Sequence, residues 1–203
     1  MTGWEALAEE IVARTQALVL LAWALRWPAR ALLGPREAVL AGAALAGAAA
    51  LADPWLEFLS LTVALFAPFS LLVTAMALDD LARPFRKAPR LVPTPAWALG
   101  LGLAVMIAYL AASMGLVAFD PYRLGYQPPW PGVVVALLLL WAWRRGDLWL
   151  ALACLAAQGL WHAGIGSDNG FDQIAHALLV PILAVRLARA LARGRRPATA
   201  SPS

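Results

Sequence analysis

The side chains best suited to chemistry gather in one short stretch near the end of the chain. The protein has two histidines, His162 and His176, and Asp172 lies four residues before the second one. Within a continuous helix, residues four apart lie on the same face, so Asp172 and His176 are expected to point the same way. Two imidazoles and one carboxylate can hold Zn²⁺ with an open position for water, or non-haem Fe²⁺. The segment therefore predicts a divalent metal site, zinc or iron, formed by His162, Asp172 and His176.

Two further carboxylates, Glu57 and Asp168, could complete this site. An ionisable side chain within an apolar span is costly, which makes Glu57 a functional candidate. Water bound to Zn²⁺ has a pKa of about 7 and can attack an ester or an amide, and Glu57 is then a candidate catalytic residue, as general base. These residues predict a membrane-embedded, metal-dependent hydrolase that acts on a lipid or another apolar substrate.

Two other interpretations of the same residues stay open. In the first, His162 and His176 are the axial ligands of a b-type haem in a membrane electron-transfer subunit. In the second, Asn169 or Asp168 caps the last helix, Asp172 offsets the helix dipole, and the histidines bond to neighbouring carbonyl groups. The chain would then be a non-catalytic membrane subunit or scaffold of a larger membrane complex.

The composition indicates whether the chain that carries these residues folds in water or in a membrane. The chain has 203 residues, of which 62% are hydrophobic and 14% are charged. Soluble domains have roughly 45–50% apolar and about 25% charged residues. In water, a chain of this size would leave much of its apolar surface exposed. We therefore expect an integral membrane protein, and we exclude an ordinary soluble enzyme and a disulfide-rich scaffold.

The basic character of the chain is interpreted as a signal for membrane orientation. The net charge is +4, and the positive residues lie in short segments between apolar stretches, where they set orientation. We therefore expect no nucleic-acid partner. The expected partners are membrane lipid and membrane proteins that pack against small-residue helix faces, such as the one that contains Gly42 and Gly47.

Seven apolar stretches are candidates to cross the roughly 30 Å of hydrocarbon. They cover residues 7–27, 38–52, 55–78, 96–118, 132–143, 148–164 and 171–191. The first contains several charged residues, and six spans would be left if it did not cross. The sequence therefore predicts an all-α bundle of seven transmembrane helices. It forms a single domain, residues 1–193, followed by a basic, polar and disordered tail, residues 194–203.

The arginines predict how this bundle is oriented. They follow the first, third, fifth and seventh stretches, whereas the alternate connections contain only Arg123. By the positive-inside rule, the N-terminus lies outside and the C-terminus inside, as in a multi-pass protein of a bacterial inner membrane. At one inner end, Asp79 and Asp80 stand beside Arg83 and Arg86, and we expect a solvated helix end with local ion pairs.

Seven spans with His162, Asp172 and His176 near helix ends loosely resemble the alkaline ceramidase and adiponectin-receptor group, which are zinc-dependent membrane amidases. That group has three histidines, two of them four residues apart in the last helix. This chain has Asp172 and His176 there instead, so the resemblance does not establish membership. It implies an embedded metal hydrolase by analogy of architecture alone.

Overall fold

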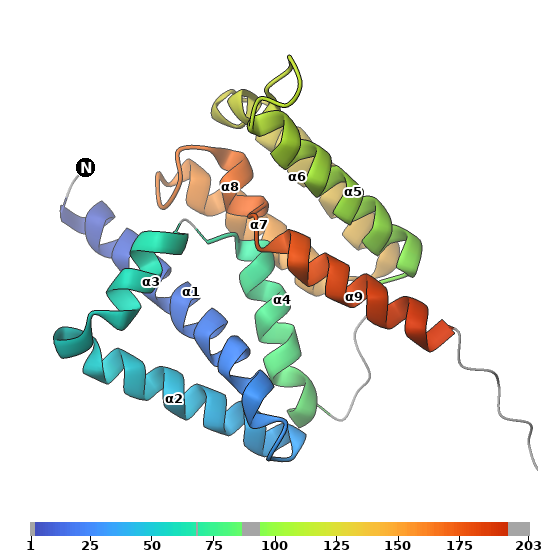
Figure 1. The fold of residues 1–203 in the computed structure, drawn as a ribbon. Helices are drawn as coiled ribbons and strands as arrows, with labels where there is room; N and C mark the ends of the chain where they lie inside the picture. The colour runs from blue at the N-terminus through green and yellow to red at the C-terminus, as the bar shows by residue number, and fades with distance from the viewer. Residues whose placement is uncertain (1–2, 68, 87–93, 195–203) are drawn as a thin grey trace, which may run out of the picture. The chain divides into compact units, whose positions relative to one another are not determined.

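The computed structural model describes residues 3–67, 69–86 and 94–194, and this part of the chain is helical without a strand (Figure 1). The helices are α1 (Gly3–Ala29), α2 (Pro35–Leu56), α3 (Phe58–Phe66), α4 (Leu71–Ala82), α5 (Ala96–Ser113), α6 (Trp130–Arg145), α7 (Leu148–His162), α8 (Gly170–Ile174) and α9 (Leu179–Gly194). Two short 3-10 helices are η1 (Arg83–Phe85) and η2 (Pro121–Tyr126). The predicted all-α class is confirmed. Most of the predicted tail, from residue 195 onward, lies outside the described residues.

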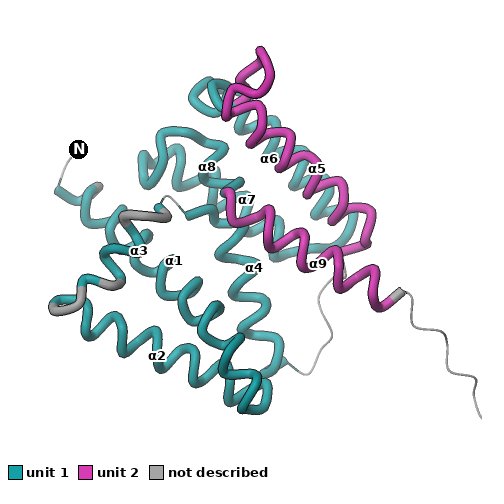
Figure 2. Tube along the Cα trace, viewed as in Figure 1, with its two compact units in different colours: residues 1–92, 122–176 teal, residues 93–121, 177–203 magenta. Residues whose placement is uncertain are grey.

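The chain divides into two compact units, which Figure 2 shows in different colours. Unit 1 comprises residues 1–92 and 122–176, and it contains α1 to α4 and α6 to α8. Unit 2 comprises residues 93–121 and 177–203, and it contains α5 and α9. The single domain over residues 1–193 stays a prediction.

Three helical stretches are long and apolar enough to cross a membrane. They are Pro35–Pro54 in α2, Ala96–Ser113, which is the whole of α5, and Gly170–Arg193, which contains α8 and all of α9 but its last residue. Helix α7 is also apolar but shorter. These stretches make a membrane location possible, while the count of seven spans and the orientation of the termini stay predictions.

The predicted third span, residues 55–78, is interrupted. Helix α3 ends before Ala67, whose backbone is extended, and α4 begins after Ser70. The Ser70 hydroxyl caps α4 by accepting hydrogen bonds from two backbone N–H groups of its first turn. Pro68 lies outside the described residues, but a proline disfavours helical backbone in the residue before it, here Ala67. The prediction of one continuous stretch over 55–78 was therefore wrong.

The predicted seventh span, residues 171–191, is interrupted as well. Helix α8 ends at Ile174, and Ala175 has extended backbone (φ −119°, ψ 128°). The Ile174 carbonyl accepts a hydrogen bond from the Ser70 hydroxyl. The next helix, α9, begins at Leu179, so Pro181 lies in its first turn. A proline is tolerated there, whereas inside a helix it would remove a backbone hydrogen bond. Asp172 and His176 are thus not on one continuous helix, and the expectation that their spacing gives them a common face was wrong.

Close packing of α1 on α2 positions the N-terminal half of unit 1 (Figure 1). A Cβ atom at Gly42 would lie 2.6 Å from the Ala22 carbonyl oxygen and 3.0 Å from the Arg26 amide nitrogen. Only glycine permits this approach of the two backbones, so the predicted small-residue packing is confirmed at Gly42. At Gly47 a Cβ atom would meet no atom within 4 Å.

A buried ion pair joins α1 to α4. Arg26 is 6% exposed, and its guanidinium donates to the Asp80 carboxylate at 3.2 Å and to the Asp80 carbonyl at 2.7 Å. The Trp23 indole N–H donates to the same carboxylate at 3.2 Å, and Arg83 pairs with it at 2.8 Å. The predicted local ion pairs are confirmed. The expected solvation was wrong for Asp80, because Arg26 and Trp23 of α1 cover it.

Unit 2 consists of α5 packed along α9. A Cβ atom at Gly100 or Gly102 would make ordinary contacts with Leu187 and Leu183 of α9. The remaining surface of α5 carries large exposed apolar side chains, namely Trp97, Leu101, Val105 and Ile107. An apolar surface of this kind suits a helix that is surrounded by lipid.

Candidate functional site

The two histidines of the predicted metal site have separate surroundings. His162 is exposed at the end of α7, and the Gln158 amide nitrogen lies 2.8 Å from its Nε2 atom. Because an amide nitrogen only donates, Nε2 accepts this hydrogen bond. His176 is half-buried in the irregular segment between α8 and α9, with its ring centroid 6.4 Å from that of Phe69.

Asp172, in the first turn of α8, is held by two hydroxyl groups. The Tyr122 hydroxyl donates to its Oδ2 atom at 2.8 Å, and the Ser167 hydroxyl donates to the same atom at 2.9 Å. In the part of the chain that the structure describes, no three His, Cys, Asp or Glu side chains form a group that could hold a metal ion. The structure does not bring His162, Asp172 and His176 together, and metal binding at these residues stays a prediction.

Glu57, the candidate general base, lies at the junction of α2 and α3 with a positive φ of 48°. Its side chain is exposed and forms no hydrogen bond or ion pair with the described residues. The buried carboxylate at this junction is instead Asp53, which is 4% exposed. Asp53 accepts hydrogen bonds from the Arg14 guanidinium, the Leu59 and Ser60 backbone N–H groups and the Ser60 hydroxyl. It therefore holds the junction together.

Asn169 caps α8, which confirms one of the two cap positions predicted from the sequence. Its Oδ1 atom accepts a hydrogen bond from the Phe171 backbone N–H at 2.9 Å. Its amide nitrogen donates to the Tyr122 carbonyl at 3.0 Å, and its backbone N–H donates to the Ser167 hydroxyl at 3.1 Å. The residue is fully buried, so these three bonds satisfy polar groups that water cannot reach.

Tyr122, Ser167, Asn169 and Asp172 form one polar assembly, the Tyr122 cluster, which ties η2 to the loop before α8 and to α8 itself. Gly125 in η2 allows the close fit, because a Cβ atom there would overlap the Asn169 side chain. Partial burial raises the pKa of the Tyr122 phenol above its ordinary value, and the hydrogen bonds with Tyr126 and Asp172 raise it further. Tyr122 thus keeps its proton as a hydrogen-bond donor.

The sequence analysis missed Tyr122 and Ser167 as functional residues. Tyr122 follows Asp120 and Pro121, a pair that signals a turn, and nothing local connects it to a carboxylate fifty residues later. Ser167 lies two residues before the cap residue Asn169, and a hydroxyl at that place can bond to loop backbone. That local signal could have identified Ser167.

The Tyr122 cluster offers structural hydrogen bonds and no activated nucleophile. Ser167 donates its proton to a carboxylate that already accepts one from Tyr122, whereas a nucleophilic serine passes its proton to a base that a third group orients. Comparison of the chain with known protein families, curated proteins and solved structures finds no match.

Proposed function

We propose that the chain is a non-catalytic subunit or scaffold of a membrane complex. The observation that carries this proposal is that Asp172, the one carboxylate among the three predicted metal ligands, accepts two hydrogen bonds from within the protein. Tyr122 and Ser167 both donate to it, and so it joins separate segments of unit 1. Asp53 and Asp80 are used in the same way at two other helix junctions. A catalytic acid or base would instead be directed at a substrate.

The proposed location is a bacterial inner membrane, which the chain crosses several times. The stretches Pro35–Pro54, Ala96–Ser113 and Gly170–Arg193 support this location. The alternation of arginine-rich and arginine-poor connections favours seven spans, with the N-terminus outside and the C-terminus inside.

The outward face of α2 supports association with another membrane helix. Leu40, Ala44, Gly47 and Leu51 are all exposed and follow each other at helical spacing. We call these four residues the α2 outer stripe. In lipid, small residues let a second helix approach closely and gain packing contacts. Gly42 already does this for α1 on another face of the same helix, and Gly47 offers the same opportunity to a partner.

Replacing Gly47 by leucine tests the proposal. The full chain is extracted from its source membrane into native-lipid discs, and the mass of the intact complex is measured. Wild-type protein is expected to carry a stoichiometric partner, and Gly47→Leu is expected to release it, because the leucine fills the contact surface. Gly159→Leu is the matched control: Gly159 is also a helical glycine with no atom within 4 Å of its Cβ position. A wild-type protein recovered without a partner, or equal loss in both variants, contradicts the proposal.

A further inference from the structure

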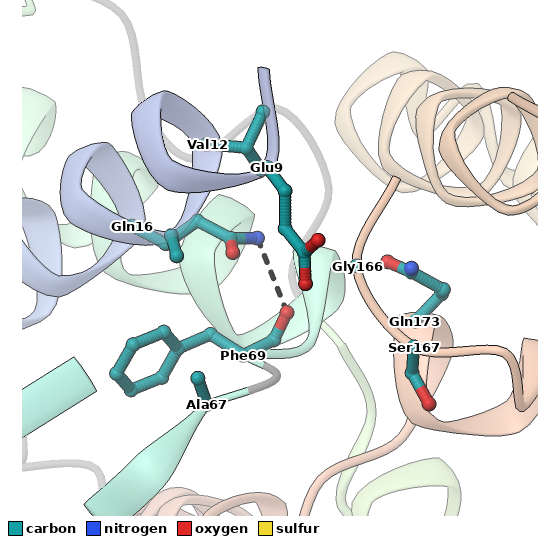
Figure 3. Close-up of a pocket in the computed structure, with 9 residues that line it drawn as sticks. Glu9, Val12, Gln16, Ala67, Phe69, Gly166, Ser167 and Gln173 are labelled. Carbon is teal, nitrogen blue, oxygen red and sulfur yellow. Dashed lines mark hydrogen bonds between the residues drawn. The ribbon is translucent and has the colours of Figure 1, made fainter. Parts of the chain in front are cut away.

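A pocket of about 240 Å³ opens in unit 1 between α1, the segment before α4 and the loop that leads into α8 (Figure 3). Its polar lining comes from Glu9, Gln16, Ser167 and Gln173, and the Phe69 side chain packs in the core beside it. Pockets for drug-sized ligands measure about 300–1,000 Å³. This one therefore suits a smaller ligand or one group of a larger molecule.

Glu9 gives the pocket an uncompensated negative charge. It is half-buried, and it forms no ion pair or hydrogen bond with any residue that the structure describes. Figure 3 shows its carboxylate extending from α1 into the space between Phe69 and Gln173. The adjacent Glu10 differs, because it is exposed and pairs with Arg14 at 3.0 Å. Among the described lining residues there is no Lys or Arg, so a positive charge must come from a ligand.

Two buried amides add hydrogen-bond acceptors. Gln16 is 6% exposed and donates through Nε2 to the Phe69 carbonyl at 3.1 Å, and Gln173 is 3% exposed and donates through Nε2 to the Ile165 carbonyl at 2.8 Å. Each carbonyl partner fixes which end of the amide is the nitrogen. Both Oε1 atoms are then left without a partner in the described part of the chain. In Figure 3 the Gln173 oxygen is turned toward Glu9.

We propose that this pocket binds a small organic ammonium group. Glu9 supplies the opposite charge, and the oxygens of Gln16 and Gln173 accept N–H groups. A single carboxylate matches one monovalent cation, whereas Ca²⁺ takes 6–8 oxygen ligands with several carboxylates among them. This inference goes beyond the proposed scaffold function and does not depend on it, because the pocket and the α2 outer stripe are separate surfaces.

Free amines and lipid headgroups both carry this chemistry, and the experiment distinguishes them. The full chain is placed in lipid discs made only of phosphatidylglycerol, which has no amine, and is titrated by calorimetry with ethanolamine, choline and, separately, NaCl and CaCl₂. In a second arm, phosphatidylethanolamine is added to the discs and the thermal midpoint is measured. Saturable binding in the first arm assigns a free amine, and stabilisation in the second arm alone assigns a lipid headgroup.

Two variants and one control connect the binding to the pocket. Glu9→Gln removes the charge and is expected to weaken amine binding by about tenfold or more. Glu10→Gln changes the neighbouring carboxylate outside the pocket lining and is expected to bind as wild type. Ala13→Lys keeps Glu9 but places an ammonium group one turn away on the same face of α1. The lysine is expected to pair with Glu9 inside the pocket and so to prevent the amine from binding.

The thermal midpoint of each variant shows that it is folded. Glu9→Gln is expected to melt no earlier than wild type, because it removes a carboxylate without an internal partner. Should Glu9→Gln fail to fold, Ala13→Lys carries the test. The proposal is overturned if neither amines nor amine lipids bind, if Glu9→Gln or Ala13→Lys binds them as tightly as wild type, or if CaCl₂ alone binds at Glu9.

Discussion

Tyr122 connects η2 to the rest of the Tyr122 cluster in unit 1. Its hydroxyl donates to Asp172 and its carbonyl accepts from Asn169, so it bonds twice to the segment around the start of α8. Losing the hydroxyl would leave Asp172 with Ser167 as its donor in this cluster. Removing a hydrogen bond from a half-buried carboxylate lowers the stability by more than an average hydrogen bond contributes, because the desolvation of the carboxylate is no longer offset.

Tyr122→Phe is therefore expected to lower the free energy of unfolding by about 1–2 kcal/mol at neutral pH. The effect has a predictable pH dependence. The pKa of Tyr122 is raised in the folded state, so the folded protein holds the proton more tightly than the unfolded chain does. The stabilisation is complete below the unfolded pKa of about 10 and is lost as the pH rises above it.

Thermal melts of wild type and Tyr122→Phe in detergent, from neutral pH to above the ordinary tyrosine pKa, check this prediction. The difference in stability between the two proteins should shrink in the alkaline range. Tyr126→Phe is the comparison variant and is expected to lower the stability less than Tyr122→Phe, because the Tyr126 hydroxyl is exposed and its contact with the Tyr122 hydroxyl is long, 3.5 Å. A difference that stays constant or grows with pH would show that Tyr122 does not act as a protonated donor.

At the residue scale, the sequence predicts local interactions and misses distant ones. Asn169 is recognisable as a cap because a cap bonds to the backbone two residues on. The partnership of Tyr122 with Asp172 depends on how the loops fold together, and no pattern within either segment contains that information. The prediction for His176 failed for a related reason. Helix α8 ends at Ile174, whose carbonyl accepts a hydrogen bond from Ser70, a residue far away in the sequence.

At the scale of elements, the closest contact between helices is that of α1 with α2 at Gly42. Gly42→Ala is expected to lower the thermal midpoint, because its methyl group would enter the space of the Ala22 carbonyl oxygen and the Arg26 amide nitrogen. Overpacking of this kind costs about 1–3 kcal/mol. The prediction is specific to this face of the helix.

Gly47→Ala in the same helix is the matched control. Its methyl group meets open space, and alanine is a better helix former than glycine by about 0.5–1 kcal/mol. Gly47→Ala should therefore raise the thermal midpoint while Gly42→Ala lowers it, as measured by circular dichroism in detergent. Equal effects of the two substitutions would mean that α1 does not approach α2 at Gly42.

The sequence predicts the elements well where hydrophobic length alone determines them. The expected stretches 132–143 and 148–164 correspond to α6 and α7 within a few residues. The prediction fails at 55–78 and 171–191, where apolar residues continue but the helix ends, at Ala67 before a proline and at Ala175 beside the Ile174 carbonyl that accepts from Ser70. Apolar length indicates how much chain can enter lipid, and it does not report whether the backbone hydrogen bonds continue.

At the scale of the whole molecule, the polar and apolar residues serve different purposes. Large apolar side chains such as Trp97 and Leu51 are exposed, as a surface in contact with lipid requires. The buried charges Arg26, Asp53 and Asp80 bind each other, polar side chains or backbone groups within unit 1. Asp53, Asp80 and Asp172 therefore connect separate segments of the chain. Glu9 and Glu57 both lack an internal partner among the described residues, but Glu57 is exposed, whereas Glu9 is half-buried in a pocket and therefore points to a ligand.

The metal content of the full chain, purified in detergent without chelators and measured by mass spectrometry, tests the central claim that these polar residues hold helices together and do not hold a catalytic metal. We expect well below one zinc or iron per chain in wild type, the same low content in His176→Ala, and no haem band in the visible spectrum. A full equivalent of zinc or iron in wild type that disappears in His176→Ala would contradict this claim, and would favour the metal-dependent hydrolase instead.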